Sequence, residues 1–442
     1  MTSKRLFAFA LPFFVCSSAF FSCREKVSEE ALIQQQKISE EEAARARAES
    51  EARALEERKN AAVSSYIDSF SDEVKVSQLF LVNIEGNETY SAVESSPDGK
   101  PLVPGGCLLF SYNIASEPEN VFSFTKSISD FYMRNENIPP YIAIDQEGGD
   151  VNRLRGLTSV LWSQKKVAER FSVEDAKRLY ASQARQMRLL GIDMNLAPVV
   201  EVETDANSEF LGTRTFGPLE QTLSYGESEI GGFEENGIAT VLKHFPGNSN
   251  VDPHSGLPEL RIPSASFDSY IKPFESLLPK SSALLMSHAV VVFDTEAAGL
   301  KSERIPACLS NFWVSDIVRK RLAFDGLILS DDIFMGALAK NGYPPEKAVV
   351  QAIESGINVI MLSEKKFGDV AKILLDESLK NPSLKACIDD SVRRVVEYKI
   401  KSGILSLEES DDGSFKVLPV ARGEFDKESF DSCKKEGMKL YE

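Results

Sequence analysis

The residues best suited to chemistry are the histidines, because imidazole is the side chain whose ordinary pKa lies closest to neutrality. The 442 residues contain only three, and all three lie in short polar motifs. His244 lies in Lys-His-Phe-Pro-Gly, His254 in Asp-Pro-His and His288 in Met-Ser-His. This placement predicts that at least one of them transfers a proton, although a lone histidine is more often a hydrogen-bonded structural residue.

Other polar groups directly follow apolar runs. Asp145 begins Asp-Gln-Glu-Gly-Gly, Lys243 and His244 close a second run, and Asp331 and Asp332 close a third. Any one of these groups could be a helix N-cap or a turn, because Asp and Ser are favoured in both. Their joint occurrence favours one site at the ends of a set of strands.

Eight short apolar runs predict the strands that would position these groups. They are mostly continuous rather than alternating, as expected of parallel strands buried on both faces, and they cover 78–83, 106–110, 141–145, 194–198, 239–244, 283–290, 327–330 and 359–362. Helical patterns lie between several of them, at 173–190, 221–236, 310–322 and 345–355. Residues 63–405 therefore fit a single α/β domain, a (β/α)₈ barrel of TIM type, better than two open-sheet domains.

The first residues, 1–23, predict an export signal, since Lys4 and Arg5 precede an apolar run that ends at Ser22 and Cys23. The end of this run resembles a bacterial lipoprotein signal, in which Cys23 is lipidated and anchors the chain to a membrane. Ordinary cleavage and an uncleaved anchor are the alternatives. The mature chain is therefore expected to be exported.

Residues 24–62 predict a charged helical stalk, because they are rich in Glu, Ala, Arg and Lys and contain no Gly or Pro. Glutamates and arginines recur at spacings that allow pairing along a solvated helix. A coiled-coil helix is the alternative, although no sustained apolar heptad is present. Residues 406–442 are polar and predict a C-terminal tail that is too short to be a second domain.

Composition excludes several classes of function. A net charge of −17 argues against nucleic acid as a partner, because neutralising phosphates needs a basic face. No cofactor or metal is expected, since the sequence has no glycine-rich phosphate loop and no Cys-x-x-Cys pair. The cysteines beyond the signal are far apart, at Cys107, Cys308, Cys387 and Cys433.

Five motifs occur in an order that resembles a known family. They are 145–149 followed by Arg153, 191–199, 212–217, 243–247, and 324–326 continuing to Asp332. Together they resemble the β-N-acetylhexosaminidase branch of glycoside hydrolase family 3 over about residues 75 to 365. The resemblance implies a retaining enzyme that removes terminal β-linked N-acetylglucosamine from cell-wall fragments or other glycans.

The resemblance also implies roles for individual residues. Asp331 matches the nucleophile that forms a covalent glycosyl-enzyme, with Asp332 as the rival assignment. Asp252 and His254 match an acid/base pair on a mobile loop, where the imidazole moves the proton and the carboxylate fixes its tautomer. His288 matches a structural position. The residues that match sugar-binding positions are Asp145, Arg153, Arg214, Lys243 and His244.

The sequence departs from the family pattern near the acid/base pair. The segment between Lys-His-Phe-Pro-Gly and His254 is two residues shorter, Pro253 stands where Ser is common, and Glu201 replaces a common Asp. Three alternatives therefore stay open. They are a β-glucosidase of the same family, a phosphorolytic member, because an imidazole repels phosphate less than a carboxylate does, and a non-catalytic glycan-binding lipoprotein.

Overall fold

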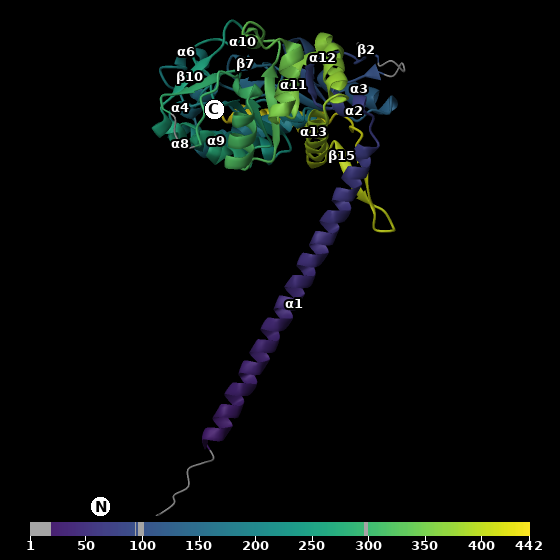
Figure 1. Ribbon diagram of the computed structural model, residues 1–442, viewed down its shortest axis with the longest axis vertical. Helices are drawn as coiled ribbons and strands as arrows, with labels where there is room; N and C mark the ends of the chain where they lie inside the picture. Colours follow the sequence, from purple (N-terminus) through teal and green to yellow (C-terminus); the bar gives the residue numbers. More distant parts are fainter. Residues whose placement is uncertain (1–18, 93, 96–100, 296–298) are drawn as a thin grey trace, which may run out of the picture. The chain divides into compact units, whose positions relative to one another are not determined.

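The computed structural model describes residues 19–92, 94–95, 101–295 and 299–442, and Figure 1 labels its helices and strands. The chain divides into two units, Met1–Ala61 and Ala62–Glu442. Residues 1–18 of the predicted export signal lie outside the described residues, and Cys23 lies within the first helix. Within the described ranges, no helix combines the length and the hydropathy that crossing a membrane requires.

Helix α1 (Ala19–Asp68) confirms the predicted charged helix at 24–62. Ion pairs on its exposed surface join Arg45 to Glu49 at 2.9 Å and Lys59 to Glu56 at 3.0 Å. Such pairs contribute only about 0.3–0.5 kcal/mol each, so the helix depends mainly on the propensity of its Ala, Glu and Arg residues. Its last turns belong to the second unit, where Val63 and Ile67 are buried.

Eight parallel strands close a barrel in the second unit. Their spatial order is β1 (Phe80–Asn83), β14 (Val359–Ser363), β13 (Leu327–Asp332), β11 (Ala283–Met286), β9 (Ala239–Phe245), β8 (Met194–Asn195), β5 (Tyr141–Ile144) and β4 (Gly106–Leu109). Strand β1 closes the ring, because it pairs with both β14 and β4. Each strand coincides with a predicted apolar run, which confirms the α/β barrel of TIM type.

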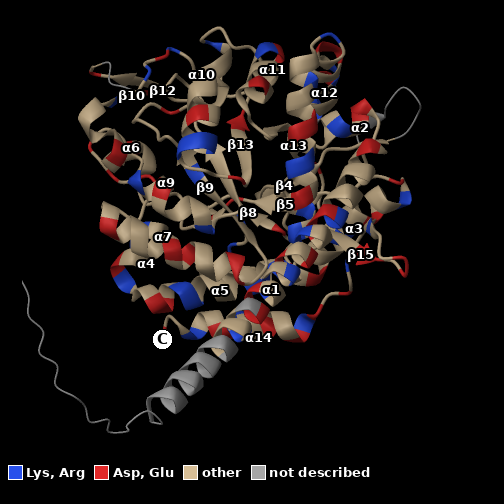
Figure 2. Cartoon of the chain, turned by 60° about the horizontal axis from the view of Figure 1, so that its bottom comes forward, with Lys and Arg blue, Asp and Glu red and all other residues tan. Residues whose placement is uncertain are grey.

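Helices cover the outside of the barrel, and Figure 2 shows their mixed charges around strands that are mostly uncharged. Three lie where the sequence predicts them, namely α5 (Val173–Leu189), α7 (Leu219–Glu234) and α11 (Pro345–Ser355). The helix predicted at 310–322 is a π-helix, η5 (Phe312–Arg321). Further helices of the second unit, some of them short and in loops, are α2 (Asp72–Ser77), α3 (Pro118–Arg134), α4 (Gln164–Arg170), α6 (Ser208–Leu211), α8 (Phe267–Tyr270), α9 (Lys272–Leu277), α10 (Gly336–Ala339), α12 (Glu364–Ser378) and α13 (Pro382–Lys401).

The interior of the barrel is a packed core rather than a pore. Apolar side chains from the barrel strands, among them Leu81, Tyr141 and Leu329, form one buried cluster. A second cluster packs outside the strands around Trp313, whose ring lies 5.9 Å from those of Phe245 and Phe267. Burial on both sides explains why the strand sequences are continuous apolar runs.

The strand predicted at 283–290 is wrong in its second half. Strand β11 ends at Met286, and β12 (Val290–Phe293) pairs outside the barrel with β10 (Glu259–Ile262). The backbone leaves the barrel at Ser287 and His288. Both strands are buried, so the hydrophobic pattern of the sequence could not reveal the break between them.

The polar tail predicted at 406–442 is corrected by the structure, which folds these residues. Strands β15 (Leu405–Glu409) and β16 (Phe415–Pro419) form a hairpin, and α14 (Lys427–Lys439) packs on α5. The side chain of Phe430 is fully buried. Gly437 lies so close to α5 that a Cβ there would be 2.6 Å from the Ser182 hydroxyl. The helix buries few side chains, which is why its sequence resembles a solvated tail.

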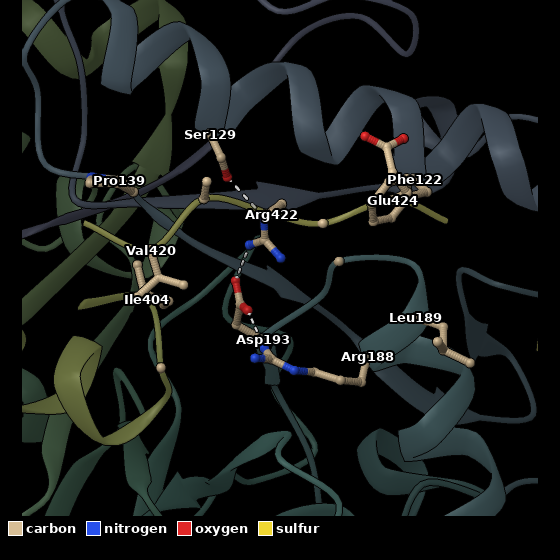
Figure 3. A pocket seen from close by; sticks show the side chains of 14 residues that line it. Phe122, Ser129, Pro139, Arg188, Leu189, Asp193, Ile404, Val420, Arg422 and Glu424 are labelled. Atoms are coloured by element: carbon tan, nitrogen blue, oxygen red, sulfur yellow. Dashed lines mark hydrogen bonds and ion pairs between the residues drawn. The ribbon is translucent and has the colours of Figure 1, made fainter. Parts of the chain in front are cut away.

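Arg422 fastens this C-terminal segment to the amino-terminal end of β8 (Figure 3). It donates to Asp193 at 2.6 Å and to the Ser129 hydroxyl at 2.8 Å. Asp193 is 1% exposed and also accepts from Arg188 at 2.7 Å. The three charged side chains line a cavity of about 250 Å³. A buried carboxylate with two guanidinium partners therefore ties the chain's end to the barrel.

Candidate active site

A larger cavity, of about 700 Å³, lies at the carboxyl ends of the barrel strands. Its lining contains all eight catalytic and sugar-binding residues that the sequence predicts, namely Asp145, Arg153, Arg214, Lys243, His244, Asp252, His254 and Asp331. Asp332, the rival nucleophile, lines it as well. The structure thus brings together side chains that are up to 186 positions apart in the chain, between Asp145 and Asp331.

A buried network of charges forms the floor of this cavity. Glu147, 2% exposed, accepts two hydrogen bonds from Arg214, at 2.8 and 2.9 Å, and pairs with Lys243 at 2.6 Å. Lys243 also donates to Asp145 at 2.7 Å. Burial would raise the pKa of Glu147, but the Lys243 ammonium and the Arg214 guanidinium lower it to about 2. Glu147 is therefore charged, and the network fixes the positions of these four side chains before a ligand binds.

Glu147 is a site residue that the sequence reasoning missed. The signal was present, because Glu147 lies within the Asp-Gln-Glu-Gly-Gly motif between Asp145 and Arg153. Its partners Arg214 and Lys243 are far along the chain, so only the fold shows that one carboxylate orients both cations.

A second buried carboxylate, Glu201, fixes His244 and the start of the loop that follows β9. Its Oε1 lies 2.7 Å from His244 Nδ1, and its Oε2 accepts from the Asn248 backbone N–H at 2.6 Å. The Asn248 side chain adds a third contact, at 3.2 Å to Oε1. The sequence indicated Glu201 only as a departure from the family pattern. The structure shows that its carboxylate orients a cavity residue and a loop together.

Asp331 and Asp332 end β13 at the cavity but differ in their surroundings. An Asp331 carboxylate oxygen accepts from the Asp332 backbone N–H at 2.9 Å, whereas the Asp332 carboxylate accepts from Phe334 N–H at 2.9 Å, in the turn that follows. Burial raises the pKa of Asp332 to about 6, against the lowering effect of that hydrogen bond. The Asp332 carboxylate is therefore held by the backbone of the turn that follows β13.

His288 supports the end of β13 from behind. Its Nε2 donates to the Asp332 carbonyl at 2.9 Å, and its Nδ1 lies 3.2 Å from the Cys308 sulfur. Burial lowers the pKa of His288, so the ring is neutral at pH 7. These contacts agree with the structural position expected from the sequence.

Asp252 and His254 form a pair on the exposed side of the cavity. His254 Nδ1 lies 2.8 Å from Asp252 Oδ1, and the same oxygen accepts from the His254 backbone N–H at 2.9 Å. These two bonds lower the pKa of Asp252. The His254 side chain remains 70% exposed and the Asp252 side chain 56% exposed. With Nδ1 held by the carboxylate, Nε2 is the nitrogen available to exchange a proton.

Two phenylalanines give the cavity apolar walls. The Arg153 guanidinium lies 5.5 Å from the centre of the Phe110 ring, and that of Arg214 lies 5.7 Å from the Phe210 ring. Arg153 Nε is buried and has no hydrogen-bond partner among the described residues. The cavity therefore combines apolar faces with charged donors and acceptors, as sites for polar ring-shaped ligands do.

Comparisons with known proteins agree on one family. The family description "Glycosyl hydrolase family 3 N terminal domain" matches residues 72–398. A β-hexosaminidase of Idiomarina loihiensis is 31% identical over 61% of this chain and 79% of its own, and one of Psychromonas ingrahamii is 30% identical over 69% and 87%. A family 3 β-N-acetylglucosaminidase of Paenibacillus superposes with a TM-score of 0.67 at 26% identity, over 83% of this chain and 68% of that one.

Proposed function

Since the chain belongs to glycosyl hydrolase family 3 and is a glycoside hydrolase of the β-hexosaminidase type, we propose a specific reaction for it. The enzyme removes terminal β-linked N-acetylglucosamine with retention of configuration. One observation carries the proposal. The same cavity is lined by Asp331 and by the exposed pair Asp252 and His254. A nucleophile and a proton donor at one cavity are what double displacement requires.

In the first step, an Asp331 oxygen bonds to the anomeric carbon while the bond to the leaving oxygen breaks. His254 Nε2 gives its proton to that oxygen, and Asp252 stabilises the ring while it is charged. In the second step, His254 takes a proton from water, whose oxygen attacks the anomeric carbon and releases Asp331. Asp332 is less suited to attack, because its carboxylate is bound to the following turn.

The charged floor of the cavity supplies the contacts for the sugar. Asp145 can accept hydrogen bonds from sugar hydroxyls, while Lys243, Arg214 and Arg153 can donate them. Asp145, Lys243 and Arg214 already have hydrogen-bonded protein partners, and the Arg153 guanidinium lies over the Phe110 ring. Sugar binding therefore needs little reordering of these side chains, which favours affinity.

The test is hydrolysis of 4-nitrophenyl N-acetyl-β-glucosaminide by residues 62–442, compared with Asp331→Ala and His254→Ala. We expect Asp331→Ala to abolish turnover and His254→Ala to reduce it by about 10²–10⁴-fold. If the wild type and both variants are equally inactive while N-acetylglucosamine still binds, the chain is a binding module. Faster turnover of the matching β-glucoside would favour the β-glucosidase alternative, and sugar 1-phosphate formed in phosphate buffer would identify a phosphorylase.

We also propose that the chain is exported and carries lipid on Cys23, so that the helix at 24–62 separates the anchor from the catalytic unit. The support is the layout of residues 1–23 and the length of α1. Metabolic labelling with a fatty-acid analogue tests this, with Cys23→Ser as the control. Equal labelling of both forms, or none of the wild type, would contradict it.

A further inference from the structure

The loop between β9 and β10 carries Asp252 and His254, and it is attached at both ends. At its start, Asn248 is bound by Glu201 through its backbone and its side chain. At its end, the Pro253 carbonyl accepts from the Ala337 backbone N–H at 2.9 Å, and the Ser255 carbonyl accepts from the Lys340 ammonium at 3.2 Å. Ala337 lies in α10, and Lys340 directly follows that helix.

Gly336, the first residue of α10, permits this attachment. A Cβ built on Gly336 would lie 2.4 Å from the His254 carbonyl oxygen, which is closer than real atoms of these kinds approach. Unlike many glycines of the chain, Gly336 does not have a positive φ. The glycine is therefore needed for the close approach of two backbones and not for an unusual backbone conformation.

The same segment carries the proposed nucleophile. Strand β13 ends at Asp332, whose carboxylate and carbonyl accept from the backbone N–H groups of Phe334 and Met335, at 2.9 and 3.0 Å. The chain then enters α10 directly. Only five positions separate Asp331 from Gly336, so the surface that holds the His254 loop is part of the turn that holds the nucleophile.

The exposure of the pair shows why this attachment matters. The side chains of His254 and Asp252 are 70% and 56% exposed, so they have little side-chain packing to fix their position. The backbone of 253–255 makes contacts with α10 that help to fix the pair, in addition to the hydrogen bonds that join Asn250 to residues 205–210. A proton donor must be placed closely against the leaving oxygen to act.

We propose that Gly336 and Lys340 are positioning residues that seat the acid/base loop on the β13–α10 segment and thereby set His254 relative to Asp331. The inference rests on the roles proposed above for these two side chains. Gly336 acts through the His254 backbone, and Lys340 acts through Ser255. Neither residue needs to touch the sugar.

Gly336→Ala tests this with two N-acetyl-β-glucosaminides of residues 62–442, one with a phenyl and one with a 2,4-dinitrophenyl leaving group. Phenol needs a proton to depart, whereas dinitrophenolate does not. We expect kcat/KM to fall about 100-fold for the phenyl substrate and less than about threefold for the dinitrophenyl substrate. Azide attacks the glycosyl-enzyme without needing a base. It should therefore restore part of the kcat that the variant loses on the dinitrophenyl substrate. Equal losses on both substrates, or no loss, would overturn the inference.

Gly423→Ala is the matched control, because Gly423 also lacks a positive φ and a Cβ there meets nothing within 4 Å. It should leave both rates unchanged. Lys340→Met should lower the phenyl rate by about threefold, with Lys372→Met, on an exposed ion pair, as its control. A Lys340→Met variant that matches Lys372→Met would remove Lys340 from the inference.

Hydrogen exchange supplies a readout that does not depend on activity. Gly336→Ala should speed exchange of the Ala337 amide and of peptides covering 249–256, and Gly423→Ala should not. A wild type that hydrolyses neither substrate would refute the proposed function and this inference with it. An active wild type whose Gly336→Ala variant keeps native exchange and an unchanged phenyl rate would refute the inference alone.

Discussion

Replacement of Glu147 by Gln should destabilise the catalytic unit by about 3 kcal/mol at pH 7. The carboxylate is 2% exposed and has two cationic partners, Arg214 and Lys243. Although burial opposes the change, these partners lower its pKa from 4.5 to about 2. Each pKa unit corresponds to about 1.4 kcal/mol, so this shift in pKa gives a decrease of about 3 kcal/mol in the free energy of unfolding.

The pH dependence follows from the direction of this change. Because the pKa of Glu147 is lower in the folded chain than in the unfolded chain, its stabilisation is complete above about pH 4.5 and is lost as the pH falls toward about 2. Gln does not titrate. The difference between wild type and variant should therefore shrink by roughly a third to a half at pH 3.5.

Urea unfolding of residues 62–442 at pH 7 and pH 3.5 measures both quantities. Glu235→Gln is the control, because Glu235 pairs with Lys177 at 2.7 Å but is 63% exposed. An exposed pair contributes about 0–1 kcal/mol, so this variant should change little at either pH. A loss below about 1 kcal/mol for Glu147→Gln, or an equal loss at both pH values, would refute the reasoning.

Three further predictions concern other parts of the chain. Asp332→Asn should stabilise the unit by up to about 3 kcal/mol at pH 7.5, because burial raises the pKa of Asp332 to about 6. The gain should fall to about a fifth of this value near pH 4, where the folded group is protonated, and unfolding at both pH values measures the difference. Arg422→Ala should lower the unfolding free energy by about 2–3 kcal/mol without changing kcat/KM, since Arg188 still pairs with Asp193; a change in kcat/KM would contradict this. Removal of residues 1–61 should shift the unfolding temperature by less than about 2 °C in calorimetry, and a larger shift would show that the two units stabilise each other.

The barrel could be predicted from sequence because its strands are buried on both sides. Runs such as Tyr141–Ile144 and Val359–Ser363 have no polar alternation, and that pattern fits few architectures. The π-helix Phe312–Arg321 could not be predicted, because its apolar spacing also fits an α-helix. The final helix was missed for a similar reason, since Phe430 is its main buried side chain.

The site was predictable where residues sit at strand ends and less so where they act through distant contacts. Asp145, Lys243 and Asp331 each follow or close a strand, so the fold class itself places them together. Glu201 depends on contacts with His244 and Asn248 that no local pattern indicates. The contact between the His254 loop and Gly336 forms only because two segments that are far apart in the chain meet in the fold. The local sequence of either segment does not indicate it.

The attachment of the C-terminal segment bears on how the chain is synthesised. Arg422 lies 229 positions after Asp193, and α14, which packs on α5, is synthesised after all eight barrel strands. A nascent chain with all eight barrel strands already made still exposes the face of α5 that α14 covers, and Asp193 then has one arginine partner, where the folded chain has two. Until α14 is made, the apolar side chains that Phe430 packs against also stay exposed, as apolar surface does in a folding intermediate. The barrel strands alone therefore do not complete the apolar core of the second unit, because Phe430 of α14 is part of a buried cluster.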